Sequence, residues 1–325
     1  MTKAIRIHEP GGPEVLRWEE VSVGEPGPGQ VRLRQTAVGL NYIDVYHRTG
    51  MYPLADMPAI IGMEGAGIVE AVGDGVADLR EGDRVAYAGL PVGAYAEARV
   101  MPAVKVVPLP GDINDQTAAA MMLQGMTVEY LIRRTFEVQA GDTILIHAAA
   151  GGVGLILCQW ASHLGATIIG TVGSDEKAEL ARAHGCDHPV IYTRENLVER
   201  VREITGGEGV PVVYDSVGKD TFDASLDCLR PRGMLVLFGA ASGPPPPFDL
   251  GQLAAKGSLY ITRPTLMTYT AHRQDLVASA EALFGVVRDG AVKIEINQRY
   301  ALRDTAEAHR DLEARKTTGS TILMP

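Results

Sequence analysis

The sequence predicts an α/β protein in which a β-rich domain, built from both ends of the chain, is interrupted by a doubly wound α/β domain. Three observations favour this fold. Short strands separated by Gly/Pro turns fill the chain up to about residue 101. From residue 143 to 240, runs of Val, Ile and Leu alternate with amphipathic helical segments, which is typical of a parallel sheet covered on both faces. The final GSTILMP returns to strand-like sequence.

The elements of the β-rich domain follow from alternating or continuous apolar residues. Strands are expected at 4–7, 31–41, 65–73 and 83–89, and a strand pair with a Gly turn at 89–101. GEPGPG at 24–29 predicts a turn. Helical periodicity covers 112–136, with Asp112 or Asn114 as the N-cap.

The α/β domain is expected to alternate strands and helices. The predicted strands are 143–148, 166–173, 188–193, 210–217, 234–240 and 258–265. The predicted helices are 151–165, 174–185 with Ser174 as N-cap, 195–207, 220–233 and 272–290. GPPPPF at 243–248 predicts a surface loop, because consecutive prolines cannot form regular structure.

Composition excludes several classes of protein. The chain has 325 residues, 46% hydrophobic and 22% charged, which indicates a globular protein of one large or two ordinary domains. A net charge of −10 disfavours nucleic acid and anionic membranes as partners. Cys158, Cys186 and Cys228 form no CxxC or Cys/His cluster, so neither disulfides nor a structural zinc site are expected. No signal peptide or membrane span is expected, and the cytoplasm is the default location.

The run HAAAGGVG at 147–154 predicts a dinucleotide-binding turn. Ala149, Gly151 and Gly154 fit the fingerprint G-x-G-x-x-G, with alanine in the first place. The run follows a predicted strand and opens a predicted helix, whose N-terminal N–H groups favour a pyrophosphate. The alternative is a Gly-rich turn without a ligand.

The end of the second strand favours NADPH over NADH. An NAD site usually places an acidic residue there, against the ribose hydroxyls. Here the strand ends in Gly173 and Ser174, and Lys177 follows within one helical turn. Together with Tyr192, at the end of the next strand, these residues suit a 2′-phosphate. For Lys177 alone, an ordinary solvated helix position is an equal alternative.

Several runs carry a resemblance that extends over nearly the whole chain. They are HEPGGPEVL (8–16), GLNYIDVYHRTGMYP (39–53), GMEGAGIVEAVG (62–73), GDRVAY (82–87), GAYAE (93–97), the cofactor turn, YDSVG (214–218), GSLYITRP (257–264) and TTGSTILMP (317–325). With them the chain resembles the zinc-free quinone oxidoreductases of the medium-chain dehydrogenase/reductase superfamily, the group that includes ζ-crystallin. The resemblance implies a GroES-like catalytic domain at 1–124 and 267–325, a Rossmann NADPH-binding domain at 125–266, and a homodimer. It also implies reduction of quinones by hydride transfer.

The resemblance also implies site residues. Those lining the substrate cleft near the nicotinamide would be Asn41, Tyr42, Ile43, Asp44 and Tyr46, and of these Asn41, Tyr42 and Tyr46 would also contact the cofactor. Those holding the cofactor would be Tyr130, Gly151, Gly152, Val153, Gly173, Ser174, Lys177, Tyr192, Ser216, Phe238, Gly239, Ala240, Ala241, Pro264, Thr265, Leu266 and Arg315. Gln124 departs from the basic or small residue expected at its position, and its role stays open.

A zinc mechanism is not expected. Zinc-dependent members of the superfamily have a cysteine where this chain has Asn41 and a histidine where it has Met63, and a catalytic zinc needs three ligands. A quinone accepts hydride readily and needs mainly a donor to the developing oxyanion. Asn41 and Tyr46 are the candidates for that catalytic donor, and Tyr42 and Tyr130 the candidates for stacking on the ring. For each stacking tyrosine, ordinary packing is an equal alternative.

The remaining histidines are not expected to take part in chemistry. His147 is expected to pack beneath the cofactor turn. The surface is the expected location of His163, His184, His188, His272 and His309.

Two further functions are alternatives to quinone reduction. An NADPH-dependent enone or enoyl-thioester reductase would need a basic mouth for a pantetheine phosphate, and the N-terminal segment has no Lys/Arg cluster. A structural or RNA-binding role, as in relatives of ζ-crystallin, is disfavoured by the negative charge. The apolar strand at 258–265 is expected near the edge of the α/β sheet, where pairing with its twin would form the dimer.

Overall fold

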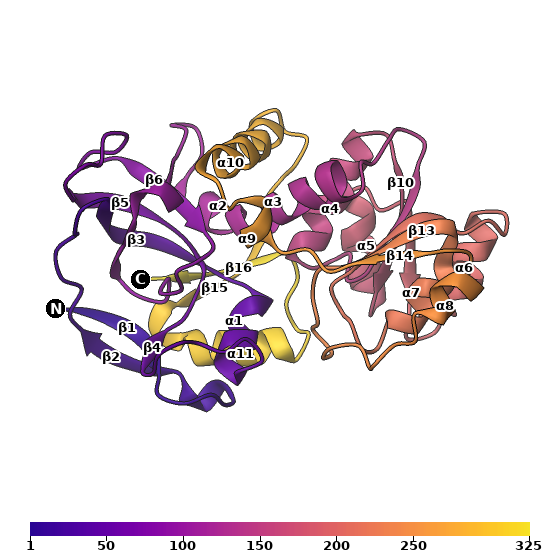
Figure 1. The fold of residues 1–325 in the computed structure, drawn as a ribbon, viewed down its shortest axis with the longest axis horizontal. Coiled ribbons are helices and arrows are strands. Elements are labelled where there is room, and N and C mark those ends of the chain that lie inside the picture. The colour runs from indigo at the N-terminus through magenta and orange to yellow at the C-terminus, as the bar shows by residue number, and fades with distance from the viewer. The chain divides into compact units, whose positions relative to one another are not determined.

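The computed structural model describes all residues 1–325, which divide into two compact units (Figure 1). Unit 1 contains Met1–Met126, Tyr269–Arg288 and Ile294–Pro325, and unit 2 contains Thr127–Thr268 and Asp289–Lys293. Unit 1 is therefore assembled from both ends of the chain.

The main sheet of unit 1 has seven strands in the order β15-β16-β3-β5-β6-β8, with β7 also paired to β3. Their bounds are β3 (Gln30–Leu40), β5 (Glu64–Val72), β6 (Arg84–Ala88), β7 (Ala98–Pro102), β8 (Val107–Pro108), β15 (Ile296–Ala301) and β16 (Ser320–Met324). A second sheet joins β2 (Arg17–Val21), β1 (Thr2–Ile7) and β4 (Ala59–Ile60). In β3, Val31 and Leu33 are buried and Arg34 is exposed, as the alternating sequence requires.

The strand pair expected at 89–101 is wrong, since only β7 forms there. The backbone of Tyr95 forms hydrogen bonds with segments that are distant in sequence. Tyr95 N donates to Ile61 O at 2.9 Å, and Ile5 N donates to Tyr95 O at 2.8 Å. These long-range bonds hold the segment as a loop between other strands, with one isolated bridge between Ala4 and Ala96.

The helix expected at 112–136 is interrupted. It divides into α2 (Asp115–Ala119), α3 (Met122–Tyr130) and a short π-helix at Leu131–Thr135. Asn114 is the N-cap of α2, because its side chain accepts from Thr117 N at 2.8 Å. The break before α3 leaves the Leu123 N–H unpaired within the helix, and it donates to Glu64 at 2.8 Å.

Unit 1 also contains α1 (Tyr42–Thr49), α10 (Arg273–Arg288) and α11 (Thr305–Glu313). The helix predicted at 272–290 is α10. Two helices, α1 and α11, were not predicted; they lie side by side (Figure 1) and are joined by a hydrogen bond between Arg48 and His309.

Unit 2 contains a six-stranded sheet in the order β11-β10-β9-β12-β13-β14, with every pair parallel. The strands are β9 (Thr143–Ile146), β10 (Thr167–Val172), β11 (His188–Ile191), β12 (Val210–Asp215), β13 (Leu229–Leu237) and β14 (Tyr260–Thr262). The strand order places the first and fourth strands next to each other, which is the doubly wound arrangement of a Rossmann fold. The predicted α/β fold is confirmed.

The strands of unit 2 are connected mainly by helices. These are α4 (Gly152–His163), α5 (Asp175–Ala183), α6 (Leu197–Ile204), α7 (Phe222–Cys228) and α8 (Gly251–Ala255), and α9 (Leu266–Tyr269) follows β14. Ser174 caps α5 as predicted. The helix predicted at 220–233 is shorter, because Pro231 cannot continue it and Leu229 already pairs with Val210. The polyproline run forms no regular element, and no helix is both long and apolar enough to cross a bilayer.

Candidate functional site

The dinucleotide turn of unit 2 connects β9 to α4. Gly151 is the N-cap of α4, and no side chain caps it. The N–H groups of the first helical turn therefore have no side-chain partner and point out of the helix, which is the arrangement that binds phosphate in proteins.

Small residues are required in this turn by close backbone contacts. A Cβ on Gly154 would lie 2.3 Å from Ala148 O and 2.6 Å from Ala149 O. A Cβ on Gly170, in the neighbouring strand, would lie 2.6 Å from the Ala149 side chain. Ala148 itself has a φ of +56°, a left-handed conformation that is uncommon for residues other than glycine. The prediction that Gly154 allows close helix–strand packing is confirmed.

Four residues predicted to recognise a 2′-phosphate lie together at the ends of β10 and β11. The Tyr192 hydroxyl would be 2.9 Å from a Cβ on Gly173. The Ser174 hydroxyl accepts from Lys177 N at 3.3 Å, so Lys177 belongs to the first turn of α5. The structure therefore brings together a glycine, the hydroxyl groups of a serine and a tyrosine, and a lysine.

A second cation, Arg194, lies here and was not predicted from the sequence. Its guanidinium binds both carboxylate oxygens of Asp175, at 2.5 and 2.8 Å. The pair lowers the pKa of Asp175, through the hydrogen bond and the charge of Arg194. Asp175 is the first acidic residue after β10, where an NAD-specific site would use a carboxylate. The signal available in the sequence was the cation two residues after Tyr192.

The remaining predicted cofactor residues of unit 2 follow the carboxyl ends of neighbouring strands. Ser216 follows β12, residues 238–241 follow β13, and residues 264–266 follow β14. A Cβ on Gly239 would lie 2.5 Å from Ser216 O, so the first two segments touch. Arg263 supports the second by donating to Gly239 O at 2.9 Å. Ligands of doubly wound sheets bind at this edge. These features fit a dinucleotide with an additional phosphate.

His147 packs beneath the turn, as predicted. Its two ring nitrogens lie 3.1 Å from Thr171 Oγ1 and 2.9 Å from Ser225 Oγ. Burial lowers its pKa, which favours the neutral ring. Tyr130, a predicted stacking residue, is only 2% exposed and leaves almost no ring surface for a ligand.

In unit 1, Asn41 is held on three sides. Its backbone N–H donates to Asp44 Oδ2 at 2.9 Å, and its Nδ2 donates to Glu64 Oε2 at 2.6 Å. Its Oδ1 accepts from Gln124 Nε2 at 3.1 Å. An amide nitrogen has two N–H groups, so one remains for a ligand. The structure thus assigns a contact to Gln124, whose role the sequence left open.

Three tyrosines and a histidine form an aromatic cluster beside Asn41 in sequence. The ring of Tyr46 lies 5.7 Å from that of Tyr42 and 5.1 Å from that of Tyr52, and His47 lies 6.1 Å from Tyr52. Such edge and tilted contacts are the arrangements that aromatic pairs prefer. Tyr52 was not predicted, although it lies within the run 39–53 that carried the resemblance.

Asp44 belongs to a buried polar network that includes His309, a residue predicted at the surface. Asp44 Oδ2 accepts from the Tyr95 hydroxyl at 2.9 Å, and the Tyr95 hydroxyl oxygen lies 3.0 Å from His309 Nε2. His309 was expected at the surface but is fully buried on α11. Its Nδ1 lies 3.0 Å from Arg48, whose guanidinium also binds Glu313 with two 2.8 Å bonds. A neutral ring is needed there, because a second buried cation beside Arg48 would repel it.

Burial changes the protonation of this network. It raises the pKa of Asp44 to about 7, against hydrogen bonds from Asn41 and Tyr95 that lower it. Burial, with the charge of Arg48, lowers the pKa of His309 to about 3. Among the other histidines predicted at the surface, His163 and His272 are exposed, whereas His184 and His188 are half-buried.

The side chains of unit 1 do not fit a catalytic zinc. Asn41 and the buried Met63 stand where the superfamily's zinc ligands would be, and Glu64 is occupied by Asn41 and Leu123. No group of three or more His, Cys, Asp and Glu side chains is arranged to hold a metal.

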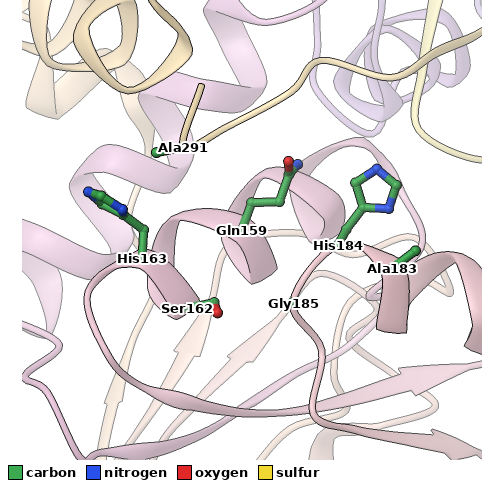
Figure 2. A pocket seen from close by; sticks show the side chains of 7 residues that line it. All are labelled: Gln159, Ser162, His163, Ala183, His184, Gly185 and Ala291. Atoms are coloured by element: carbon green, nitrogen blue, oxygen red, sulfur yellow. The ribbon is translucent and has the colours of Figure 1, made fainter. Parts of the chain in front are cut away.

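A hollow of about 300 Å³ lies elsewhere in unit 2. Figure 2 shows its lining, with His163 and His184 on either side of Gln159. It lies where α4 and α5 end, whereas the dinucleotide turn is where α4 begins. This hollow is therefore not the cofactor site.

A Rossmann sheet with a glycine-lined turn, together with a second unit carrying an anchored amide and aromatic rings, defines a dinucleotide-dependent oxidoreductase. Comparison with known proteins agrees with this class. Residues 27–111 match the alcohol dehydrogenase GroES-like domain, and residues 152–280 match the family described as zinc-binding dehydrogenase.

Relatives match over the full length. The quinone oxidoreductase of Pseudomonas aeruginosa is 54% identical, covering 100% of both chains, and a 2-haloacrylate reductase of a Burkholderia species is 49% identical, covering 100% of this chain and 99% of the relative. The solved Escherichia coli quinone oxidoreductase complexed with NADPH has a TM-score of 0.98 and 46% identity over 99% of this chain and 100% of that one. The chain belongs to the quinone oxidoreductase family of the medium-chain dehydrogenase/reductase superfamily.

Proposed function

We propose that the protein reduces quinones with NADPH by hydride transfer and without a metal. The observation that carries this proposal is the full-length similarity to quinone oxidoreductases, one of them solved with NADPH. The geometry of the two units supports it. The assignment of residues 125–266 as the nucleotide-binding domain, and of 1–124 and 267–325 as the catalytic domain, is part of the proposal.

Unit 2 would hold the cofactor. Gly151, Gly152 and Val153 would bind the pyrophosphate, while Gly173, Ser174, Lys177 and Tyr192 would bind the 2′-phosphate. When bound, NADPH supplies a hydride. The further cofactor contacts proposed in unit 2 are Ser216, Phe238, Gly239, Ala240, Ala241, Pro264, Thr265 and Leu266. Arg315 of unit 1 is also proposed, as is Tyr130, although the ring of Tyr130 is buried.

Unit 1 would stabilise the negative charge that develops on the substrate oxygen. When Glu64 is ionised, the remaining N–H of Asn41 is directed by the bonds to Glu64 and Gln124 before a substrate binds, and such preorganisation is the condition for effective oxyanion stabilisation. Tyr46 is the second proposed donor, and Tyr42, Ile43 and Asp44 line the same region. Asp44 would act by fixing the start of α1, because its carboxylate is already engaged by Asn41 and Tyr95.

Cofactor preference is tested by titrating the protein with NADPH and NADH while following fluorescence quenching. We expect NADPH to bind more tightly by an order of magnitude or more. Comparable affinities would contradict the assignment of Lys177 and Tyr192.

A second candidate is the reduction of an activated C=C bond, which the 2-haloacrylate reductase at 49% identity favours. NADPH oxidation should be compared with 1,4-benzoquinone, 2-chloroacrylate and crotonyl-CoA as acceptors. We expect benzoquinone to be reduced fastest. Fast reduction of either alkene with no benzoquinone activity would replace the first proposal with the second.

We also propose a cytoplasmic homodimer that pairs through β14. This strand is the last in its sheet, and Tyr260 within it is 58% exposed. An unpaired edge strand invites association with another strand. Sedimentation at micromolar concentration should give twice the chain mass, and a monomer would reject this interface; cell fractionation tests the location.

A further inference from the structure

A chain of buried hydrogen bonds connects Glu64 to the backbone carbonyl of Ala120. Glu64 Oε2 lies 2.6 Å from Asn41 Nδ2, and Asn41 Oδ1 lies 3.1 Å from Gln124 Nε2. Gln124 Oε1 lies 2.8 Å from Ser320 Oγ, which lies 2.8 Å from Ala120 O. All four side chains are buried, the most exposed being Gln124 at 7%. The polar atoms of each side chain must therefore find their hydrogen-bond partners among other protein atoms.

The serine end of these hydrogen bonds can be arranged in two ways. The Ser320 hydroxyl lies within bonding distance of two acceptors but carries one proton. If it donates to Gln124, the Ala120 carbonyl loses its side-chain donor. If it donates to Ala120, its oxygen must accept from the Gln124 amide, which must then be turned so that its nitrogen faces Ser320.

Turning one amide requires turning the next. With its nitrogen toward Ser320, Gln124 presents an oxygen to Asn41, so the Asn41 nitrogen must face Gln124. The Asn41 oxygen then faces Glu64, and this contact is a hydrogen bond only if Glu64 carries a proton on Oε2. The chain thus has two consistent orders, one for the ionised and one for the neutral carboxyl, and both use the same heavy-atom positions.

We propose that protonation of Glu64 reverses the donor order of this chain and thereby exchanges the N–H and C=O sides of the Asn41 amide. Glu64, Gln124 and Ser320 are positioning residues in this arrangement. Its consequence for catalysis rests on the proposed function: a substrate oxygen near Asn41 meets an N–H in one order and a carbonyl oxygen in the other.

The surroundings of Glu64 allow both charge states near neutral pH. The ionisable groups that interact electrostatically with Glu64 are Asp44 of α1, Tyr87 of β6 and Tyr95, and none of them is a cation. Burial raises the pKa of Glu64 to about 8, helped by the charge of Asp44 and opposed by hydrogen bonds from Asn41 and from the N–H groups that begin α3. The carboxyl cannot move away, since even a Cβ on Gly39 would lie 2.3 Å from its Oε2.

The test is the pH dependence of the Asn41 and Gln124 side-chain amide signals in ¹⁵N-edited NMR of the full-length protein, assigned by their loss in Asn41→Ser and Gln124→Leu. We expect both pairs of signals to move together with one midpoint near pH 8. In Glu64→Gln the new side-chain amide donates to Asn41 and accepts from Leu123, as the neutral carboxyl does. The amide signals of Asn41 and Gln124 should therefore keep their low-pH chemical shifts at every pH. Independent movement of the two residues, or a transition that persists in Glu64→Gln, would overturn the proposal.

Ser320→Ala tests the chain from its other end and keeps the proposal falsifiable if Glu64→Gln does not fold. The ionised order loses one hydrogen bond of Ser320, whereas the neutral order loses two. The midpoint should therefore fall by about 0.7 pH unit, the equivalent of one hydrogen bond. Thr321→Val is the matched control, because Thr321 is the next residue of β16 and bonds to Gln298 instead. An unchanged midpoint in Ser320→Ala contradicts the proposal.

Kinetics separate this proposal from the proposed function. For wild type, kcat/KM with 1,4-benzoquinone should change slope at the NMR midpoint, and Glu64→Gln should lack that inflection. An NMR transition without a kinetic inflection leaves the amide reversal established and removes Asn41 from the reaction. Absence of both transitions rejects the reversal itself.

Discussion

The side-chain nitrogen of Asn41 lies 2.6 Å from the carboxyl of Glu64, which also accepts from the backbone of Leu123 at 2.8 Å. One carboxyl thus connects the start of α1 to the start of α3, and both of its oxygens are used. This contact determines which atoms of Asn41 remain for a substrate, so it is the relationship on which the chemistry of unit 1 depends.

Replacing Asn41 by alanine should lower kcat for benzoquinone by about a hundredfold, because the loss of one oxyanion donor typically costs 10²–10³. NADPH affinity should stay the same. The free energy of unfolding should fall by about 1–3 kcal/mol, since Glu64 and Gln124 lose a partner. Stopped-flow kinetics and urea denaturation give these values. Thr49→Ala, at the other end of α1, is the control and should leave kcat unchanged; a normal kcat in Asn41→Ala would reject the role of this amide.

Replacing Lys177 by alanine should weaken NADPH binding by about tenfold or more, the value of a charged hydrogen bond to phosphate, and leave NADH binding unchanged. Fluorescence titration measures both constants. Arg182→Ala removes a cation from the same helix, α5, where it pairs with Glu179, and should alter neither constant. Equal weakening for the two cofactors in Lys177→Ala would point to a structural role.

A pair of glycine substitutions should act in opposite directions. Gly154→Ala places a methyl group 2.3 Å from the Ala148 carbonyl, so the turn must open and both stability and cofactor binding should be lost. Gly285→Ala, inside α10, meets no atom within 4 Å and should raise the free energy of unfolding by about 0.5–1 kcal/mol. Thermal and urea denaturation measure both changes. Tolerance of Gly154→Ala would mean that the turn is less constrained than described.

The buried His309 should make stability depend on pH. Its pKa is about 3 in the folded protein and about 6.5 in the unfolded chain, so the unfolded chain takes up the proton first. Its contribution is complete above pH 6.5 and is lost as pH falls below that value. Between pH 7.5 and 5 the difference in free energy of unfolding between wild type and His309→Gln should shrink by about 2 kcal/mol. A difference that does not change with pH would show that the pKa of His309 is the same in the folded and unfolded protein, and a difference that grows as pH falls would show that the ring is charged in the fold.

Much of unit 2 was predictable because its signals are local. The strand before the turn, the small residues of the turn and the helix after it are adjacent in sequence, and Ser174 caps its helix from one position away. In unit 1, the position of Asn114 as a cap was predictable for the same reason. The errors occurred where long-range bonds replaced local ones, as with Tyr95 in the expected strand pair and His309 on a short helix whose partner Arg48 is far along the chain.

The sequence by itself determined that this protein has a dinucleotide turn, a doubly wound sheet and no zinc-ligand set, because each depends on residue types at fixed spacing. Only the tertiary structure decided how Asn41 is oriented and what Gln124 does. Their partners, Glu64 and Ser320, come from separate strands of one sheet, and a hydrogen bond between distant segments leaves no periodic pattern in the chain. The physical reason is that a buried polar atom must find a partner wherever the fold brings one, and that choice is made by packing.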